Sequence, residues 1–451
     1  MPIGDVQIPV IGNKLVIPLL VMPHILIATF IIGITLIAPV SEYVGMITKQ
    51  RHYDRFARNA AKITLLLFAV GSSFAFTFIL ALITLYPVLW STLQNIFFWV
   101  LLAEAFMFVG EVIAVYIWYN AWDRMAYRKN LHVVFGFIAG IFGLTQMLFI
   151  NIVGAYMLSP QESSPTDVGW TFFNATYMPL TMHRFVGNLS YVGFVIAGWA
   201  GWRYLRSTAQ GDREYYDWMG HWGIVWGFGF LIMQPFIGYA YMSEIKSSSS
   251  DAFKYLMLGD KSWLFNLLVT ELLVMSAASV AYFLHKLRFA IKPMPRARNV
   301  TMGALGFTAL FGLLNMVPAD LYLVPQIGLV FGEKVNPNIP LFADPPIPLG
   351  AMYPWKYIGL IGLALTGLFA LTLYLKAAAT GFHWGRASRW SQYALLAAAV
   401  TVVFTMMTMG YARETARRAG NEGGGWLIHD CLTFQEKFVD KGCPATSKET
   451  P

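Results

Sequence analysis

The sequence predicts an all-α protein, a polytopic transmembrane helix bundle of about ten helices with both termini outside the membrane. Hydrophobic residues make up 57% of the 451 residues and charged residues only 12%, whereas a soluble domain carries about 25% charged residues. Apolar runs of about 20 or more residues, long enough to cross a bilayer, recur along the chain. Basic residues gather in alternate loops between these runs, which is typical of a multi-pass membrane protein.

Ten apolar segments are long enough to span the membrane as helices. Pro318 and Pro325 favour an early end of the eighth segment. We assign residues 1–412 to the transmembrane bundle and the polar residues 413–451 to an outer C-terminal tail. The first segment follows no basic stretch and no small-residue cleavage site, so we expect no removable signal peptide. The ten segments cover residues 17–45, 60–87, 93–121, 131–158, 180–206, 219–242, 263–287, 300–323, 355–376 and 390–411.

The positive-inside rule sets the predicted orientation. The even-to-odd connections at 86–94 and 159–179 contain no Lys or Arg, and 323–354 contains only Lys334. The 243–262 connection has three lysines, which weakens the pattern without reversing it. The net charge of +8 therefore reflects membrane orientation, and we expect a lipid bilayer and no nucleic acid as partner. The odd-to-even connections are all rich in Lys and Arg: 49–62, 122–130, 203–217, 285–298 and 376–389.

The two cysteines, Cys431 and Cys443, both lie in the predicted tail, and neither CxxC nor CxxCH occurs. This pattern argues against an iron–sulfur cluster and against covalently attached c-type haem. If the tail lies outside the membrane, the two cysteines meet an oxidising compartment, which favours a disulfide.

Ionisable residues inside a bilayer are costly and mark candidate functional sites. A neutral imidazole is a good axial ligand for haem iron, and the alternative for a histidine near a helix end is an interfacial anchor. Glu104 and Glu111 are seven residues apart, so they share one helix face about 10 Å apart along the axis. Such a pair suits a proton path; the alternative is a packed, protonated pair. The candidates, all in the predicted outer half, are His24, Glu104, Glu111, His183, Gln234 and Glu271.

The inner half has its own histidines, His132, His221 and His285. We interpret them as interfacial anchors or as charge balance, with a second haem or a quinone site as the alternative. The run Trp122-Asp123-Arg124 closes the third segment. We interpret it as an interfacial Trp anchor with a local salt bridge.

These residues, in this order, resemble subunit I of the cytochrome bd-type oxidase superfamily. The resemblance is carried by His24, the Glu104/Glu111 pair, the Trp-Asp-Arg end of the third segment and His183. It implies a membrane complex with a related second subunit, in a prokaryotic cytoplasmic (inner) membrane, which oxidises quinol and reduces dioxygen. It further implies haem b, with haem d at a third site. By this resemblance His24 ligates the oxygen-reactive or high-spin haem, His183 ligates the low-spin haem, and the glutamates hold protons or feed them to the oxygen-reducing site.

The chain departs from the family pattern near its C-terminal end. Lys356 stands where the family has Arg, and Ile358 stands where it has a Met ligand. Gly410 stands where the family has a Glu ligand, while Arg413 remains to pair with a haem propionate. Two functions therefore stay open: an oxidase subunit, and a haem electron-transfer subunit without oxygen chemistry, supplied by quinol or by an external redox protein. A haem-free transporter is the third alternative.

Overall fold

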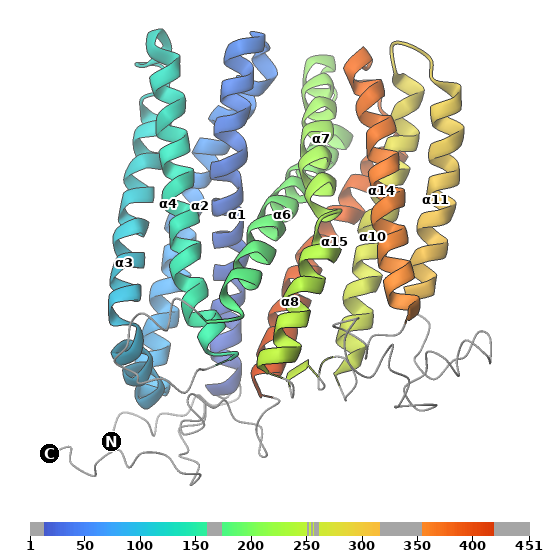
Figure 1. The fold of residues 1–451 in the computed structure, drawn as a ribbon. Coiled ribbons are helices and arrows are strands. Elements are labelled where there is room, and N and C mark those ends of the chain that lie inside the picture. The colour runs from blue at the N-terminus through green and yellow to red at the C-terminus, as the bar shows by residue number, and fades with distance from the viewer. Residues whose placement is uncertain are drawn as a thin grey trace, which may run out of the picture. The chain divides into compact units, whose positions relative to one another are not determined.

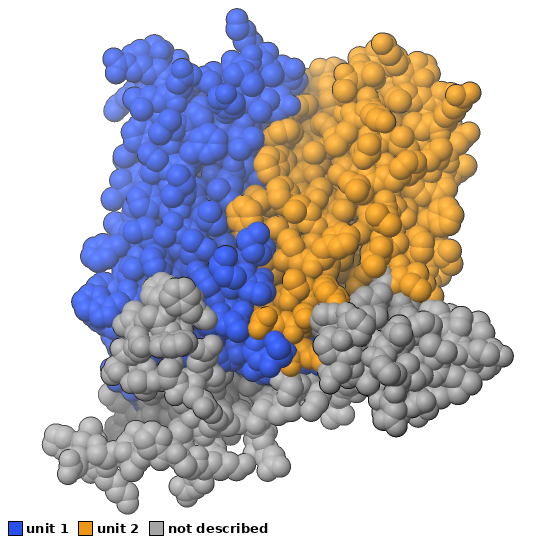
Figure 2. Space-filling view, viewed as in Figure 1, with its two compact units in different colours: residues 1–182, 247–253, 413–451 blue, residues 183–246, 254–412 orange. Residues whose placement is uncertain are grey.

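The computed structural model describes residues 13–159, 174–249, 252–253, 256, 261–315 and 354–418. Their regular elements are helices, apart from one isolated bridge between Ala290 and Phe382. The chain divides into two compact units, shown in different colours in Figure 2. Unit 1 comprises residues 1–182, 247–253 and 413–451, and unit 2 comprises residues 183–246 and 254–412.

Unit 1 is built on four long helices: α1 (Asn13–Thr48), α2 (Arg51–Leu85), α3 (Pro87–Asn120) and α4 (Lys129–Tyr156). Helix α1 packs against α2 and α4, and α3 packs against the same two helices (Figure 1). The four helices therefore form a ring in which α1 and α3 are diagonal. The turns between them are short because Lys49 adopts a positive φ of 59° and Pro87 begins α3, where its missing N–H costs nothing.

Two apolar clusters fill the core of unit 1 at different levels along the helices. The first lies toward the N-terminal end of α1, and the second lies toward the middle of the four helices. Each draws residues from all four helices and so ties the ring together. The buried members of the first cluster are Ile17, Leu82, Leu85, Tyr86, Leu89, Phe97, Val100, Ile152 and Tyr156. Those of the second cluster are Ile31, Phe68, Ala114, Val115 and Ala139.

Unit 2 contains most of the remaining helices. Helices α10, α11 and α14 pack against one another within it (Figure 1). Helix α6 enters unit 2 at His183, and α15 leaves it after Ala412. The helices are α6 (Tyr177–Arg206), α7 (Gln210–Leu231), α8 (Gln234–Ser248), α10 (Ser262–Lys286), α11 (Pro295–Asn315), α14 (Pro354–Thr380) and α15 (Arg389–Arg418).

Small residues let α6 and α7 approach closely. A Cβ atom on Gly193 of α6 would collide with the backbone of Gly227 on α7. One turn earlier, the hydroxyl of Ser190 donates to the carbonyl oxygen of Gly227 at 2.8 Å. Close backbone packing through small residues with an interhelical hydrogen bond is a common way to join helices in a membrane.

The predicted all-α helix bundle is confirmed, and a helix covers most or all of each of the ten expected segments. The segment expected at 219–242 is broken into α7 and α8, because Pro235 has no N–H to continue the helix. Nine helical segments among the described residues are long and apolar enough to cross a membrane. Helix α6 is not one of the nine; it carries His183, Arg184 and Asn188 near its start. The outer location of the termini stays a prediction.

Candidate functional site

His24 lies on α1 with one ring nitrogen held by the backbone. Its Nδ1 atom is 3.1 Å from the carbonyl oxygen of Gly71 on α2. A carbonyl oxygen can only accept, so Nδ1 carries the hydrogen, and the neutral ring keeps its lone pair on Nε2. A Cβ atom on Gly71 would come within 2.9 Å of Ile27 Cγ2, so glycine permits this approach of the two helices. Such a fixed tautomer is typical of a metal-binding histidine.

His24 and Glu104 fall at the same level of unit 1. Along α1, His24 lies between Ile17 of the first apolar cluster and Ile31 of the second. Along α3, Glu104 lies between Val100 of the first cluster and the segment that packs on the second. The two residues therefore lie at one level, between the two apolar clusters, on diagonal helices of the ring.

Glu111 is buried one heptad further along α3, with a side chain only 2% exposed. Its Oε2 atom accepts a hydrogen bond from Gln146 Nε2 on α4 at 2.5 Å. Its Oε1 atom has no hydrogen-bond partner among the described residues. A Cβ atom on Gly143 would lie 2.5 Å from Oε1, so that glycine makes room for the carboxyl group. One oxygen is thus fixed and the other is available for a proton or a ligand.

Unit 1 also holds a buried polar network that we did not predict. Glu42 and His132 are both 0% exposed, and His132 Nδ1 lies 2.5 Å from Glu42 Oε1. His132 Nε2 donates to the carbonyl oxygen of Trp118 at 2.7 Å, and Trp118 Nε1 donates to Glu42 Oε2 at 2.7 Å. Lys129 Nζ lies 2.9 Å from Glu42 Oε1. Both ring nitrogens of His132 are therefore engaged within this network, which leaves neither of them to ligate an inner haem.

Trp122 belongs to the same network. It is only 8% exposed, its ring centroid lies 4.8 Å from that of His132, and Lys129 Nζ lies 4.0 Å from that centroid. The expected salt bridge exists, but it joins Asp123 to Arg58 of α2 at 2.6 Å and is therefore not local. The Trp-Asp-Arg run thus ties α3 to its neighbours within unit 1.

Arg413, at the end of α15, belongs to unit 1. Its guanidinium lies against α4 at Gly154, where a Cβ atom would collide with it. Glycine at this position is therefore required for the guanidinium to occupy its place. A planar guanidinium held in this way can bind a carboxylate through two hydrogen bonds.

His183 lies in unit 2, near the start of α6. Its Nδ1 atom is buried and has no hydrogen-bond partner among the described residues. Gln234 Nε2 of α8 donates to its backbone carbonyl oxygen at 3.2 Å, and the ring of Tyr241 lies 5.8 Å away. A Cβ atom on Gly238 would touch the imidazole at 3.7 Å. The break before α8 therefore places Gln234 and Gly238 beside His183.

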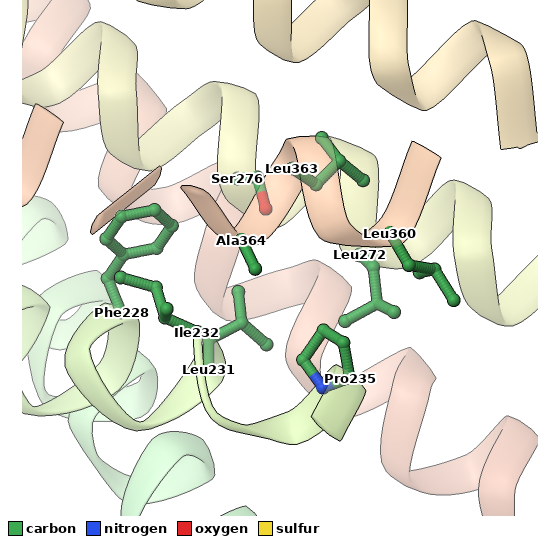
Figure 3. A pocket seen from close by; sticks show the side chains of 9 residues that line it. All are labelled: Phe228, Leu231, Ile232, Pro235, Leu272, Ser276, Leu360, Leu363 and Ala364. Carbon is green, nitrogen blue, oxygen red and sulfur yellow. The ribbon is translucent and has the colours of Figure 1, made fainter. Parts of the chain in front are cut away.

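A small cavity of about 20 Å³ lies at the break between α7 and α8 (Figure 3). Among the described residues that line it, Ser276 contributes the only polar side chain. A cavity of this size holds about one water-sized molecule, and apolar cavities usually stay dry. We therefore assign no polar ligand to it. Its lining residues are Phe228, Leu231, Ile232, Pro235, Leu272, Ser276, Leu360, Leu363 and Ala364.

A second unpredicted cluster lies in unit 2. Lys286 Nζ is 2.6 Å from Asp217 Oδ2, and both side chains are 0% exposed. The backbone N–H of Gly385 also donates to Asp217 Oδ2 at 2.9 Å. The pair therefore joins α7 and α10 to the loop before α15. Nearby, His221 Nδ1 lies 2.6 Å from the hydroxyl of Tyr374, so one nitrogen of this histidine is already engaged.

Some predicted residues lie outside the described part. The backbone of Lys356 falls in the first turn of α14, but its side chain is not described, and Cys431 and Cys443 lie beyond residue 418. Ile358 is 49% exposed, and its side chain offers no ligand atom. Among the predicted site residues, the structure places His24, Glu104, Glu111 and Arg413 in unit 1 and His183 in unit 2.

Comparison with known proteins finds a matching family and matching solved structures. Residues 14–250, more than half of the chain, match the family model described as "Cytochrome bd terminal oxidase subunit I". The solved "structure of bd oxidase from Geobacillus thermodenitrificans" matches with a TM-score of 0.52 and 15% identity, over 90% of this chain and 97% of that chain. At this identity the likeness shows the fold alone. None of the curated proteins matches this chain.

Proposed function

The chain belongs to the cytochrome bd terminal oxidase subunit I family, and from this premise we propose that it is a membrane haem subunit that passes electrons to dioxygen. The matched residues 14–250 include the two histidines and the two glutamates of the candidate site. The subunit would work in a prokaryotic cytoplasmic membrane with a second, related membrane subunit. Its electron donor would be a quinol or an external redox protein.

The observation that carries this proposal is the state of His24. Its Nδ1–H is held by the carbonyl of Gly71, which leaves Nε2 as the ligand atom for haem iron. His183 supports a second haem, because its buried Nδ1 has no hydrogen-bond partner in the described part of the chain and glycine borders its ring. These donors fit haem b, and the same donors fit a d-type haem. When bound, haem supplies electron transfer and an iron centre for oxygen.

The remaining site residues would bind the haem propionates or carry protons. We assign Arg413, held against Gly154, to a haem propionate. Lys356 takes the same role by its place in the sequence. Glu104 would receive a proton at the level of the four helices where His24 also lies. Glu111 would hold a proton on Oε1, which has no hydrogen-bond partner within the described ranges, while Gln146 keeps the carboxyl group in place through Oε2.

The second candidate is a haem electron-transfer subunit without oxygen reduction. It is favoured by the loss of two ligand side chains, since Ile358 and Gly410 stand where the family has Met and Glu. An oxidase needs an iron centre that is open to a ligand, whereas an electron-transfer subunit needs only six-coordinate haem. The two candidates therefore differ in how the reduced haem responds to carbon monoxide.

The test is a reduced-minus-oxidised spectrum of the purified protein, repeated with carbon monoxide. We expect haem bands, with one component shifted by carbon monoxide. Haem bands without any carbon monoxide response would replace the oxidase with the electron-transfer subunit. A protein that carries no haem would overturn both.

A further inference from the structure

Two loops of unit 2 are joined to each other at one end of its helices. Residues 287–294 connect α10 to α11, and residues 381–388 connect α14 to α15. Ala290 of the first loop and Phe382 of the second form an antiparallel bridge. Two backbone hydrogen bonds between the loops, of 3.0 and 2.9 Å, flank this bridge. The two loops therefore form one continuous surface.

A buried ion pair fixes both loops to the helices. Lys286, directly before the first loop, pairs with Asp217 of α7 at 2.6 Å. The same Asp217 oxygen accepts the backbone N–H of Gly385 in the second loop at 2.9 Å. The surface formed by the loops is therefore preorganised, and the side chains on it start from a fixed backbone.

These loops and the helical turns beside them carry cations but no acidic residue. Residues 287–298 and 376–390 contain neither Asp nor Glu. Their Lys and Arg side chains are all exposed, and none of them forms an ion pair with a described residue. In unit 1, by contrast, Lys129 pairs with Glu42. The cations, which we call the basic platform, are Arg288, Lys292, Arg296, Arg298, Lys376, Arg386 and Arg389.

This concentration of like charge is unfavourable without a counter-charge. Arg296 and Arg298 lie in the first turn of α11, and Arg389 begins α15. The positive end of the helix dipole disfavours cations at these positions, in addition to their mutual repulsion. An anion bound at the platform would offset both effects.

The basic platform lies at the level of the lipid headgroups. Helices α10, α11, α14 and α15 are each long and apolar enough to cross a membrane, and every platform residue lies within about one turn of a helix end there. Trp390, beside Arg389, is 72% exposed, which is typical of an aromatic residue at the membrane–water interface. Further along α11 from Arg298, Val300 and Met302 are 42% and 57% exposed. The cations therefore adjoin apolar side chains that acyl chains can cover.

We propose that the basic platform binds the headgroup phosphates of anionic phospholipids. A phosphate carries the missing charge and accepts charge-assisted hydrogen bonds from Arg and Lys. A free phosphate ion has the same charge, but it makes no use of the exposed apolar side chains beside the cations. The platform stands independently of the haem assignments.

The experiment uses the purified full-length protein and needs no variant. The protein is equilibrated with a mixture of phosphatidylglycerol and phosphatidylcholine that carry the same acyl chains, and the bound lipids are counted by native mass spectrometry. We expect the protein to retain phosphatidylglycerol in preference, and to keep it in millimolar inorganic phosphate. Equal retention of the two lipids, or displacement of phosphatidylglycerol by inorganic phosphate, would overturn the proposal.

Variants then locate the site. Arg296→Gln together with Arg298→Gln should weaken binding of phosphatidylglycerol roughly tenfold or more, since each cation near an anionic surface contributes about fivefold. The matched control is Arg51→Gln together with Lys62→Gln on α2, which removes two exposed cations and the same net charge away from the platform. We expect this control to bind as the wild type does. Unchanged binding in the platform variant, or equal loss in both variants, would overturn the assignment. The carbon monoxide spectrum of the same samples is a separate readout, so failure here does not contradict the proposed haem function.

Discussion

His132 Nδ1 lies 2.5 Å from Glu42 Oε1, and neither side chain is exposed. The two residues are 90 positions apart in the chain, on α4 and α1, and together they join two neighbouring helices of unit 1. Removal of His132 would leave Glu42 Oε1 with Lys129 alone and would leave the buried Trp118 carbonyl oxygen without its donor. Each buried polar group that loses its partner typically costs about 1–3 kcal/mol. A pair on the surface contributes far less because water and salt screen it.

We therefore expect His132→Ala to lower the thermal unfolding midpoint of the purified protein strongly. The control is Asp123→Ala, which breaks the bond to Arg58 between side chains that are 77% and 49% exposed. Such exposed pairs contribute about 0–1 kcal/mol, so the control should unfold close to the wild-type temperature. Equal unfolding temperatures for the two variants would contradict the role assigned to the network.

This network also shows which features the sequence predicts and which it does not. The apolar length of each segment predicts helices, because a bilayer admits only backbone that satisfies its own hydrogen bonds. The partner of a buried charge depends on which helix faces which, and one sequence carries no such information. Glu42 and Lys286 are single charges at the ends of apolar segments, where an interfacial position is the ordinary expectation. Their burial in pairs follows only from the packing.

The sequence predicts the residues of the candidate site but not their partners, because the partners depend on which helices face each other. His24 and Glu111 stand out because charged or polar residues are rare within long apolar runs. Their local partners, Gly71 O and Gln146, come from other helices and could not be read from spacing. The division of the chain into two units, with His24 in one and His183 in the other, also has no signal in composition.

The contact between Gly193 and Gly227 gives a second test of stability. Gly193→Ala should force α6 and α7 apart, because the added methyl group would collide with the backbone of Gly227. Overpacking of this kind typically costs about 1–3 kcal/mol. The control is Gly306→Ala on α11, where an added Cβ meets nothing within 4 Å. That control should be neutral or more stable by about 0.5–1 kcal/mol. Thermal unfolding in detergent separates the two, and a destabilised control would contradict the packing argument.

A double replacement tests whether Asp217 and Lys286 act as a buried ion pair. Lys286→Met alone leaves the Asp217 carboxylate buried without its cation, and we expect about 3–5 kcal/mol of destabilisation. Asp217→Leu together with Lys286→Met removes both charges, so the double variant should unfold at a higher temperature than the single variant. The measurement is the unfolding midpoint of each protein. If the double variant is destabilised by the sum of the effects of Asp217→Leu alone and Lys286→Met alone, the two charges do not act as a pair.

His24→Ala should remove one haem, because it deletes the Nε2 atom that the Gly71 contact leaves available. The haem-to-protein ratio, measured as the pyridine haemochrome, should fall by one haem per chain. The control is His383→Ala, since His383 is exposed in the loop after α14 and has no predicted ligand role. A full haem complement in His24→Ala would exclude His24 as a ligand, whatever the activity of the variant.

Glu111→Gln should separate proton transfer from haem binding. The amide keeps the shape of the side chain and can still accept from Gln146, which holds the Oε2 position at 2.5 Å. It cannot take up or release the proton that we assign to Oε1. Positioned acid–base groups contribute roughly 10²–10⁴-fold to rates, so oxygen consumption should fall by at least about tenfold while the haem spectrum is unchanged.

The comparison that decides the role of Glu111 is the ratio of turnover to haem content. Glu214→Gln is the matched control, because Glu214 bonds only to exposed Gln210 at 3.1 Å among the described residues. Normal turnover in Glu111→Gln, or loss of haem and turnover together, would contradict a protonic role. In the latter case Glu111 would support the site by packing, since Gly143 and Gln146 fit closely around its carboxyl group.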